Sequence, residues 1–311
     1  MPNKIKRDIV DRWEGNPIIK LDNLSFTTNN IFSAGAFKKE GEYILLVTME
    51  DPRGKTSIYQ ARSEDGYHFE VDEKPFLLPN PEERYQIYEE VGVREARVTY
   101  MEGRYYIIYL GVGRHGSLLC LAVTDNFNEV KRLGVISEPE TKAGALFPCQ
   151  FKDRYARLER PKAGGRIWIS YSKDLLTWGE SEVVISPRSG YWDSNWVGCA
   201  FPPMQIEEGW LLGYYGIKST SAGPITRLGA AILDRKNPCE VIARSNIPII
   251  SPREDYERTG DFTNVVFSSG AVLETDGELK IYYAAADNCL CVGTTTLSEI
   301  VKTCYDSFKE F

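Results

Sequence analysis

Apolar and polar residues alternate along this chain in short runs, and each run is bounded by a turn signal. The most regular runs follow a turn with Gly or Asp and are mostly rich in aromatic residues; they cover 41–47, 103–109, 153–158, 209–215 and 277–283. Alternation with a period of two, together with aromatic enrichment, is typical of β-strands. Only 299–311 has a pattern that fits a helix. The sequence therefore predicts an all-β protein with a short C-terminal helix.

A second strand follows each run and ends in a small polar residue and a turn. The segments 63–69 and 172–178 match most clearly, because both read as a small polar residue, a turn and an aromatic residue that starts a further strand. Five such units of about four strands each indicate a five-bladed β-propeller, and we expect one domain over 1–311. A two-sheet sandwich is the alternative, although a sandwich does not require the same unit five times.

Three charges occur within four residues where one predicted strand begins, in Arg94-Glu95-Ala96-Arg97. A glutamate flanked by two arginines at the mouth of a hairpin is well placed to hold a polar substrate. A solvated surface ion cluster is the alternative interpretation. The inner strands of a propeller converge on one axial funnel, and residues at their ends line it. We therefore expect this charged stretch at the funnel.

Further acidic, basic and aromatic residues fall in loops that a propeller directs to the same funnel. They include Glu50, Asp51, Arg62, Arg160, Asp193, Trp196, Tyr215, Glu257, Asp261 and Asp287. Carboxylates that bind hydroxyl pairs, beside rings that cover apolar sugar faces, are typical of carbohydrate sites. Asp287 follows a strand of small residues, where a charge is costly unless something polar meets it. These residues indicate a small oligosaccharide as the ligand.

Composition and charge argue against several other classes of function. A net charge of -7 and a pI near 5.2 disfavour nucleic acid and an anionic membrane surface as partners. No run of about 18 apolar residues predicts a transmembrane helix. The N-terminus is charged and lacks an apolar signal segment, so we expect a cytoplasmic protein. The oligomeric state stays open.

Cysteine and histidine usage points away from metal and cofactor chemistry. The seven cysteines are scattered and odd in number, so we expect them to be reduced and mostly buried. Only two histidines are present, which disfavours a His-rich metal site or a Ser-His-Asp triad. Phosphate-binding Gly-rich loops and metal-ligand spacings are missing as well. We therefore expect neither a metal nor a cofactor.

Several longer motifs are specific when taken together. They are Ala61-Arg-Ser-Glu-Asp-Gly-Tyr-His-Phe69, Ala145-Leu-Phe-Pro148, Glu159-Arg-Pro161, Glu208-Gly-Trp-Leu-Leu-Gly-Tyr-Tyr-Gly216, Tyr256-Glu257, Asn264-Val-Val-Phe267 and Tyr282-Tyr-Ala-Ala-Ala-Asp287. Through them nearly the whole chain resembles glycoside hydrolase family 130, the inverting mannoside phosphorylases and β-mannosidases. The resemblance implies a five-bladed propeller, in agreement with the separate repeat count.

The resemblance also implies roles for single residues. The general acid of the family is the aspartate of an Asp-Pro-Arg step, and Glu95 stands in its place. Arg62 and Asp287 match positions that hold the sugar in the cleavage subsite. Family members that hydrolyse use a carboxylate base, for which Glu257 and Asp261 are the candidates.

The positions that bind phosphate in the family differ in this chain. Trp196, Tyr215 and Thr48 stand in place of a lysine, a histidine and an arginine, whereas Arg97 and Arg160 remain. Loss of charge-assisted hydrogen bonds weakens an anion site. The leading hypothesis is therefore a hydrolase that cleaves a β-mannoside or a similar small oligosaccharide with inversion. A phosphorylase that uses inorganic phosphate in a rearranged site, and a sugar-binding propeller without catalysis, are the alternatives.

Overall fold

The computed structural model describes residues 8–306, except for the side chain of Glu83, and most of its regular structure is β. The expected all-β class is confirmed. The helices are α1 (Glu83–Glu89), α2 (Asp255–Arg258) and α3 (Leu297–Asp306). Helix α3 is the expected C-terminal helix, and 307–311 lie outside the described residues. The sequence pattern predicts neither α1 nor α2, because seven and four residues are too few to show a helical period.

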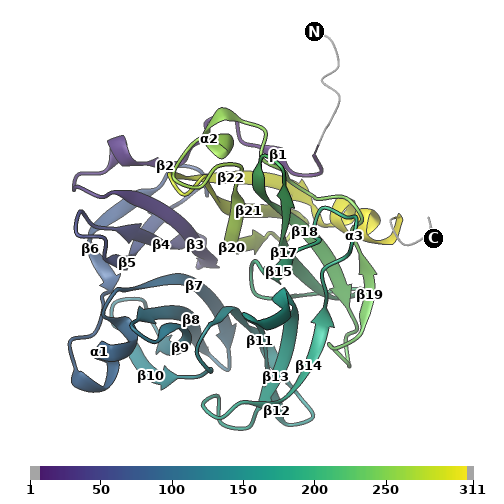
Figure 1. The fold of residues 1–311 in the computed structure, drawn as a ribbon, viewed down its shortest axis with the longest axis horizontal. Helices are drawn as coiled ribbons and strands as arrows, with labels where there is room; N and C mark the ends of the chain where they lie inside the picture. Colours follow the sequence, from purple (N-terminus) through teal and green to yellow (C-terminus); the bar gives the residue numbers. More distant parts are fainter. Residues whose placement is uncertain (1–7, 307–311) are drawn as a thin grey trace.

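The strands form five antiparallel groups that follow one another around the molecule (Figure 1). The groups are β3 (Asn30–Lys39), β4 (Glu42–Glu50), β5 (Thr56–Ser63) and β6 (Glu70–Leu77); β7 (Gly92–Met101), β8 (Arg104–Gly113), β9 (Gly116–Thr124) and β10 (Lys131–Val135); β11 (Thr141–Phe151), β12 (Arg154–Pro161), β13 (Ile167–Ser172) and β14 (Gly179–Ile185); β15 (Trp196–Cys199), β16 (Met204–Ile206), β17 (Gly209–Thr220), β18 (Gly223–Leu233) and β19 (Val241–Arg244); and β20 (Val266–Leu273), β21 (Glu278–Ala285) and β22 (Cys289–Thr296). All five aromatic runs predicted from the sequence are strands, namely β4, β8, β12, β17 and β21.

Hydrogen bonding joins the five groups into four sheets. The first two groups share one sheet because β5 and β7 are linked by a parallel bridge between Thr56 and Gly92. A Cβ at residue 92 would lie 2.0 Å from Oγ1 of Thr56, so only glycine allows this approach. Four sheets contradict the two-sheet sandwich that the sequence left as the alternative.

The N-terminal segment completes the last sheet. Strands β1 (Asp11–Arg12) and β2 (Ile19–Lys20) both pair antiparallel with β22, near the C-terminal end of the chain. The Asn16 side chain supports this pairing, since its amide donates to the C=O of Val292 at 2.7 Å and accepts from the N–H of Val292 at 2.9 Å. The two ends of the described chain are therefore held in one sheet.

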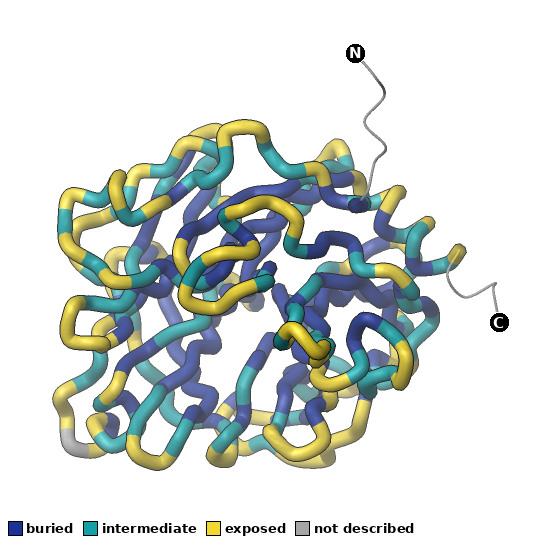
Figure 2. Tube along the Cα trace, turned by 45° about the horizontal axis from the view of Figure 1, so that its top comes forward, coloured by how far each residue is buried: buried dark blue, intermediate teal, exposed yellow. Residues whose placement is uncertain are grey.

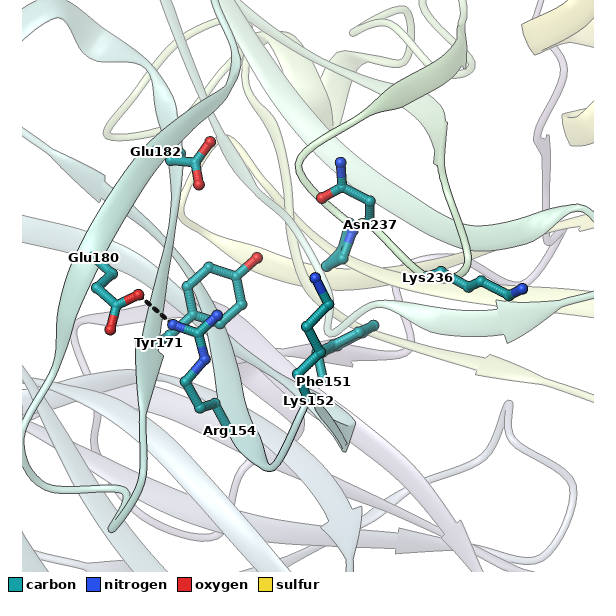
Figure 3. A pocket seen from close by; sticks show the side chains of 9 residues that line it. Phe151, Lys152, Arg154, Tyr171, Glu180, Glu182, Lys236 and Asn237 are labelled. Carbon is teal, nitrogen blue, oxygen red and sulfur yellow. Dashed lines mark hydrogen bonds and ion pairs between the residues drawn. The ribbon is translucent and has the colours of Figure 1, made fainter.

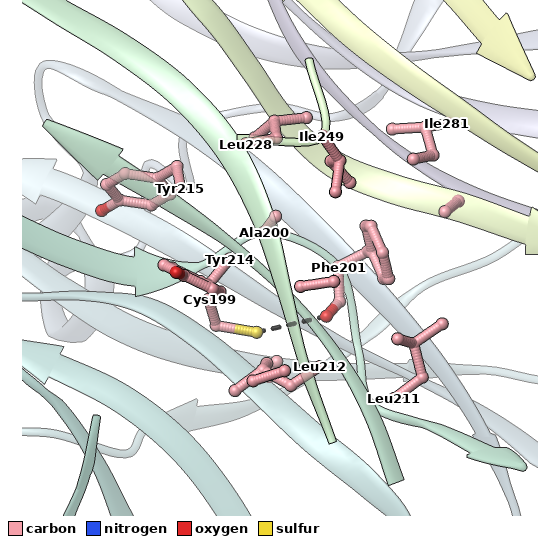
Figure 4. Packing of buried hydrophobic residues seen from close by; sticks show 14 of the residues in the cluster. Cys199, Ala200, Phe201, Leu211, Leu212, Tyr214, Tyr215, Leu228, Ile249 and Ile281 are labelled. Atoms are coloured by element: carbon pink, nitrogen blue, oxygen red, sulfur yellow. Dashed lines mark hydrogen bonds between the residues drawn. The ribbon is translucent and has the colours of Figure 1, made fainter. Parts of the chain in front are cut away.

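Apolar side chains between the groups form the core. In Figure 2 the strands are largely buried and the exposed positions concentrate in the connecting loops. Figure 4 shows part of the largest cluster, where Phe201, Leu212, Leu228 and Ile281 are drawn from separate segments. A sheet must bury its faces against neighbouring layers, so each group depends on the next one for stability. Among residues 8–306, no helix has the length and apolar character needed to cross a membrane.

The first strands of the groups pack together in the interior. Strand β3 packs against β7 and β20, and β11 packs against β7 and β15. The approach is close: a Cβ at Gly35 in β3 would lie 2.5 Å from the backbone oxygen of Ala96 in β7. Small residues on these strands therefore bring their N-terminal portions within reach of one another.

Candidate active site

Three of these first strands carry the same irregularity near their N-terminal ends. Each holds one extra residue relative to its partner strand, and the register shifts between Ile31 and Ala34 in β3, Arg94 and Arg97 in β7, and Lys142 and Ala145 in β11. β-Bulges redirect side chains and are frequent beside active sites. Side chains at all three bulges line one cavity.

This cavity has a volume of about 270 Å³. Its charged side chains are Arg94, Glu95, Lys142, Arg160 and Asp287, and its other side chains are Phe32, Ser33, Tyr215, Ile217, Thr226, Phe262, Val265 and Phe267. Of the site residues predicted from the sequence, the fold thus brings together Glu95, Arg160, Tyr215 and Asp287, which are far apart along the chain.

Glu95 sits on the bulge of β7 in the left-handed region, with φ of 56°. Its backbone N–H donates to Oγ1 of Thr48 at 3.0 Å, which fixes this conformation. Its carboxylate is 19% exposed and lies 3.8 Å from Nη1 of Arg97. A carboxyl group that is held by its backbone and open to a cavity can exchange a proton with a bound ligand.

Arg97 supports Glu95 from within the fold and does not line the cavity. The arginine side chain is only 1% exposed. Its Nε donates to the backbone oxygen of Ala200 at 2.7 Å, and Nη2 donates to that of Cys199 at 3.0 Å. Nη1 donates to the backbone oxygen of Glu95 at 3.3 Å. These bonds link β7 to the end of β15. The sequence predicts that Arg97 contacts the substrate, whereas in the structure its guanidinium group is bonded within the protein.

Asp287 is the second carboxylate of the cavity. It follows β21 with φ of 51°. Burial raises the pKa of Asp287 to about 6; the nearby Glu95 and Asp261 carboxylates also raise it, and Arg94 acts in the opposite direction. Two carboxylates in one cavity, one of them with a raised pKa, are an arrangement typical of acid–base sites.

Three cations line the cavity without a carboxylate within ion-pair distance in the described part of the chain: Arg94, Lys142 and Arg160. The buried Nε of Arg94 has no hydrogen-bond partner there. Burial lowers the pKa of Lys142; the Glu95 carboxylate opposes this effect, and the Arg94 and Arg160 guanidinium groups add to it. Clustered positive charges without a close ion pair favour the binding of an anion.

This cluster corrects an expectation from the sequence, namely that the site holds too little positive charge for phosphate. Trp196 and Tyr215 do lack the charges of a lysine and a histidine. However, Lys142 and Arg94 supply positive charge from neighbouring strands. Trp196 itself does not line the cavity, and its ring lies 5.1 Å from the guanidinium carbon of Arg160.

The rest of the cavity wall includes aromatic rings and one buried hydroxyl group without a partner. Phe32, Phe262 and Phe267 offer ring surfaces of the kind that cover the C–H face of a sugar. Ser33 is 1% exposed, and its Oγ has no hydrogen-bond partner among residues 8–306. A buried polar group without a partner is costly, and a ligand hydroxyl would satisfy it.

Glu257 lies outside the cavity, which removes it as a candidate base. Its side chain is fully buried, and both of its carboxylate oxygens accept hydrogen bonds. Oε1 accepts from Nε of Arg12 at 2.7 Å and from Oη of Tyr283 at 3.0 Å. Oε2 accepts from the backbone N–H groups of Arg253 at 2.6 Å and Glu254 at 3.0 Å. The carboxylate is thus turned into the start of α2, where it holds the N-terminal segment to the fold.

Asp193 is buried in the same way and does not contact the cavity. Its Oδ2 accepts from Nη2 of Arg188 at 2.8 Å, from Nη2 of Arg244 at 2.7 Å and from Oη of Tyr214 at 2.9 Å. Two guanidinium groups and a phenol fill its hydrogen-bonding capacity. The sequence predicts a substrate contact for Asp193, whereas in the structure its carboxylate links Arg188 to residues of β17 and β19 beneath the surface.

Two further predicted residues lie elsewhere. Arg62 is in β5, where Nη1 pairs with Glu42 at 2.8 Å on a partly exposed surface. Asp261 is exposed and accepts from Nδ2 of Asn30 at 2.7 Å. Asp261 is close enough to raise the pKa of Asp287, yet it does not line the cavity. Neither residue reaches the ligand space directly.

Lys142 is the residue that the sequence interpretation missed. It begins the bulge of β11 as Arg94 begins the bulge of β7, so the two cations occupy equivalent repeat positions. Alignment of the repeats on their first strands, rather than on their aromatic hairpins, is the signal that would have found it.

A second polar cavity of about 280 Å³ provides a contrast (Figure 3). It lies at the opposite ends of β11 and β12, roughly 25–30 Å along the strands from Lys142. Arg154 there is paired with Glu180 and stacks at 4.5 Å on the ring of Tyr171. Lys152 lines the same cavity. This charged cavity therefore already contains its own ion pair.

The described residues contain no group of three or more His, Cys, Asp and Glu side chains arranged to hold a metal ion. All seven cysteines are free thiols, and five of them are buried, as expected from the sequence.

Known mannoside phosphorylases are similar to this chain. A family model described as beta-1,4-mannooligosaccharide phosphorylase matches residues 17–306. The chain is 38% identical to a beta-1,2-mannobiose phosphorylase of Listeria innocua over 245 residues. The matched region spans 78% of this chain and 66% of that relative. The chain is also 35% identical to a beta-1,2-mannobiose phosphorylase of Thermoanaerobacter sp. over 279 residues. This matched region spans 88% of this chain and 84% of that relative.

The fold is also similar to a solved structure. The beta-1,2-mannobiose phosphorylase from Listeria innocua, in complex with beta-1,2-mannobiose, has a TM-score of 0.85 and 29% sequence identity to this chain. The superposition covers 96% of this chain and 99% of that one.

Proposed function

The chain belongs to glycoside hydrolase family 130, and we propose that it is an inverting phosphorylase that cleaves a β-mannoside with inorganic phosphate. The relatives compared above are enzymes named as mannoside phosphorylases. Hydrolysis was the leading hypothesis from the sequence, and phosphorolysis was its alternative. The comparisons and the charge of the cavity favour the alternative.

The observation that carries this proposal is the cluster of Arg94, Lys142 and Arg160 beside Glu95. Phosphate is an anion near neutral pH, and a cavity with three cations that lack close carboxylate partners is suited to hold it. Water, the nucleophile of a hydrolase, needs no such charge.

The positions of the two candidate bases predicted from the sequence support the same conclusion. An inverting hydrolase needs a carboxylate to activate water, about 6.5–9.5 Å from the acid. Glu257 is fully hydrogen-bonded away from the cavity, and Asp261 does not line it. Phosphorolysis requires no protein base, because phosphate is itself the nucleophile. One acid and a phosphate subsite are therefore sufficient.

The proposed step uses Glu95 as the general acid. An oxygen of phosphate forms a bond to C1 of the mannosyl ring, on the face opposite the leaving sugar. The bond between C1 and the leaving oxygen breaks, and Glu95 gives that oxygen its proton. The products are α-mannose 1-phosphate and the shortened sugar. The proton of Glu95 is then replaced from the bound sugar phosphate or from solvent.

Ser33 and Asp287 are the groups that we assign to the mannosyl ring. The unsatisfied Oγ of Ser33 and the carboxylate of Asp287 both line the cavity and can bind ring hydroxyls. Both relatives named above act on a β-1,2 linkage. We therefore choose β-1,2-mannobiose as the first substrate, with β-1,4-mannobiose for comparison.

We further infer that the five strand groups are the blades of a single five-bladed propeller, with the cavity at its axis. The groups follow one another around the molecule, and the N-terminal strands complete the last one. The contacts among β3, β7, β11 and β20 in the interior support this arrangement.

The experiment is an incubation of the protein with each mannobiose, with and without phosphate, followed by quantification of mannose and mannose 1-phosphate. Phosphorolysis gives one mannose and one α-mannose 1-phosphate per disaccharide, and only when phosphate is present. Two mannoses per disaccharide, independent of phosphate, would establish the hydrolase. Binding of mannobiose by calorimetry without turnover in either condition would establish the sugar-binding protein.

A further inference from the structure

Thr48 connects two of the bulges that border the cavity. The register shift in β3 leaves Thr48 as the one residue of β4 opposite the two bulge residues Phe32 and Ser33. Thr48 is fully buried, and its Oγ1 accepts a hydrogen bond from the backbone N–H of Glu95, on the bulge of β7, at 3.0 Å. It does not line the cavity itself. One buried hydroxyl group therefore joins the segment that carries Ser33 to the segment that carries Glu95.

The backbone of Glu95 is held on both sides. A φ of 56° is costly for a residue with a Cβ, and such a conformation persists where the surrounding structure holds it. Thr48 holds the N–H of Glu95, and Nη1 of Arg97 donates to its C=O at 3.3 Å. Arg97 is in turn bonded to the backbone oxygens of Cys199 and Ala200. The point from which the carboxyl group extends is therefore fixed.

The place of this carboxyl group matters for proton donation. An acid must lie within about 2.6–3.2 Å of the atom that it protonates. A misplacement of about 1 Å can cost on the order of a hundredfold in rate. Ser33 is one of the groups that we assign to the mannosyl ring, and Thr48 lies opposite Ser33 while it holds Glu95. The same residue therefore sets the acid relative to the sugar.

Residues 48 and 95 are also positions at which this chain departs from the pattern of its family. The resemblance places an arginine at the first and an aspartate at the second. In this chain the two departures are in direct contact. The hydroxyl group of Thr48 bonds the backbone of Glu95 and leaves the glutamate side chain to the cavity.

We infer that Thr48 is a positioning residue for the general acid, because its hydroxyl group fixes Glu95 relative to the part of the cavity that binds the mannosyl ring. This inference rests on the proposed function only in taking Glu95 as the acid. Hydrolysis with inversion would need the same acid. Arg97 completes the arrangement from the other side of the Glu95 backbone.

The test is the substitution Thr48→Val, which keeps the shape of the side chain and removes the hydrogen-bond acceptor. It should lower kcat for mannobiose by about tenfold to a hundredfold, with the KM values for mannobiose and phosphate within about twofold of wild type. Thr48→Ser keeps the hydroxyl group and should restore most of kcat. A Thr48→Ser variant as slow as Thr48→Val would contradict the role of the hydroxyl group.

Thr99→Val is the matched control. Thr99 is a buried residue of β7, and its Oγ1 donates to the backbone oxygen of Leu146 at 3.2 Å. The control removes a buried hydroxyl group from the strand that carries Glu95, but it leaves the N–H of Glu95 bonded. It should lower the thermal midpoint as Thr48→Val does and leave kcat near the wild-type value. An equal loss of kcat in both variants would mean that any buried hydroxyl group of this region has the same effect.

Two further measurements separate positioning from general support of the fold. Because Thr48 acts through Glu95, the double variant Thr48→Val/Glu95→Gln should be no slower than Glu95→Gln alone. With 4-nitrophenyl β-mannoside, whose leaving group needs no protonation, Thr48→Val should lose little of kcat. A residue that only stabilises the fold would slow both substrates equally, and would slow the Glu95→Gln background as much as the wild type.

The outcomes distinguish this inference from the proposed function. If wild-type protein releases mannose 1-phosphate and Thr48→Val does so at the same rate, the positioning role is wrong and phosphorolysis stands. If wild-type protein releases two mannoses per disaccharide and Thr48→Val slows that release as expected, phosphorolysis is wrong and the positioning role stands. Absence of turnover by the wild type, with and without phosphate, overturns both.

Discussion

Two pairs of acidic residues in this chain have opposite surroundings. Glu257 and Asp193 are fully buried, and each accepts hydrogen bonds from at least one arginine and one tyrosine. Glu95 and Asp287 line the cavity, where the ion-pair contact of Glu95 is a distant one to Arg97 at 3.8 Å. From sequence, all four look alike, since each is an acid in a loop or at a strand end near aromatic residues.

The difference shows how to separate structural acids from functional ones. A buried charge is tolerable when partners in the protein satisfy it, and such a residue has nothing left to offer a ligand. A half-buried charge without close partners is maintained at a cost in stability, which a ligand can offset on binding. The four predictions below test this contrast, from the largest expected effect to the smallest.

Glu95→Gln should cause the largest change, a loss of kcat for phosphorolysis of about 10² to 10⁴. The amide keeps the size of the side chain but cannot donate the proton that the leaving oxygen needs. The thermal midpoint should change little, because Glu95 has no close ion pair. The measurement is the rate of mannose 1-phosphate release at saturating substrate.

A second substrate sharpens this result. With 4-nitrophenyl β-mannoside the leaving group departs without protonation, so the loss in Glu95→Gln should be much smaller. An equal loss on both substrates would show that the glutamate binds sugar rather than acting as the acid.

Glu257→Gln should leave the chemistry intact and reduce the free energy of unfolding by about 3–5 kcal/mol. The substitution leaves the Arg12 guanidinium partly unpaired and disturbs the bonds to the N–H groups of Arg253 and Glu254. Urea unfolding monitored by tryptophan fluorescence measures the change. Full stability combined with loss of turnover would return Glu257 to the active site.

Asp287→Asn tests how much stability the protein loses when the Asp287 carboxyl group is ionised in the cavity. The pKa of Asp287 is raised from 3.8 to about 6, chiefly by burial. The stabilising contribution of the protonated acid is thus fully present below pH 3.8 and is lost as the pH rises through about 6. Relative to wild type, the neutral amide should add about 1–3 kcal/mol of stability at pH 8 and little at pH 4.5.

Unfolding of both proteins at the two pH values measures this difference. A stability gain that is the same at pH 4.5 and pH 8 would show that packing, and not ionisation, distinguishes the amide. The same variant should turn over substrate poorly, because the amide replaces a carboxylate that we assign to the mannosyl hydroxyls.

The strands and the charged stretch at the start of β7 could be predicted from the sequence, because alternation, turn residues and charge are local signals. The partners of buried acids could not. Arg12 in β1 reaches Glu257 in α2, and Arg244 in β19 reaches Asp193 from 51 residues further along the chain. Lys142 was missed for a similar reason, since its neighbours at the cavity, Arg94 and Arg160, are set by strand register and bulges rather than by nearby sequence.

Arg62→Ala should have the smallest effect of the four. The sequence resemblance assigned Arg62 to the sugar, whereas the structure pairs it with Glu42 at 2.8 Å on β4, with a third of the arginine side chain exposed. Exposed ion pairs contribute about 0–1 kcal/mol, so stability should fall by no more than this amount. The KM values for mannobiose and phosphate should not change, because the side chain does not border the cavity. Steady-state kinetics beside urea unfolding measures both, with Glu42→Gln as the matched partner variant. A rise in the KM for mannobiose in Arg62→Ala alone would mean that the arginine leaves its partner to bind substrate, and that a paired surface charge in this fold can still be a functional one.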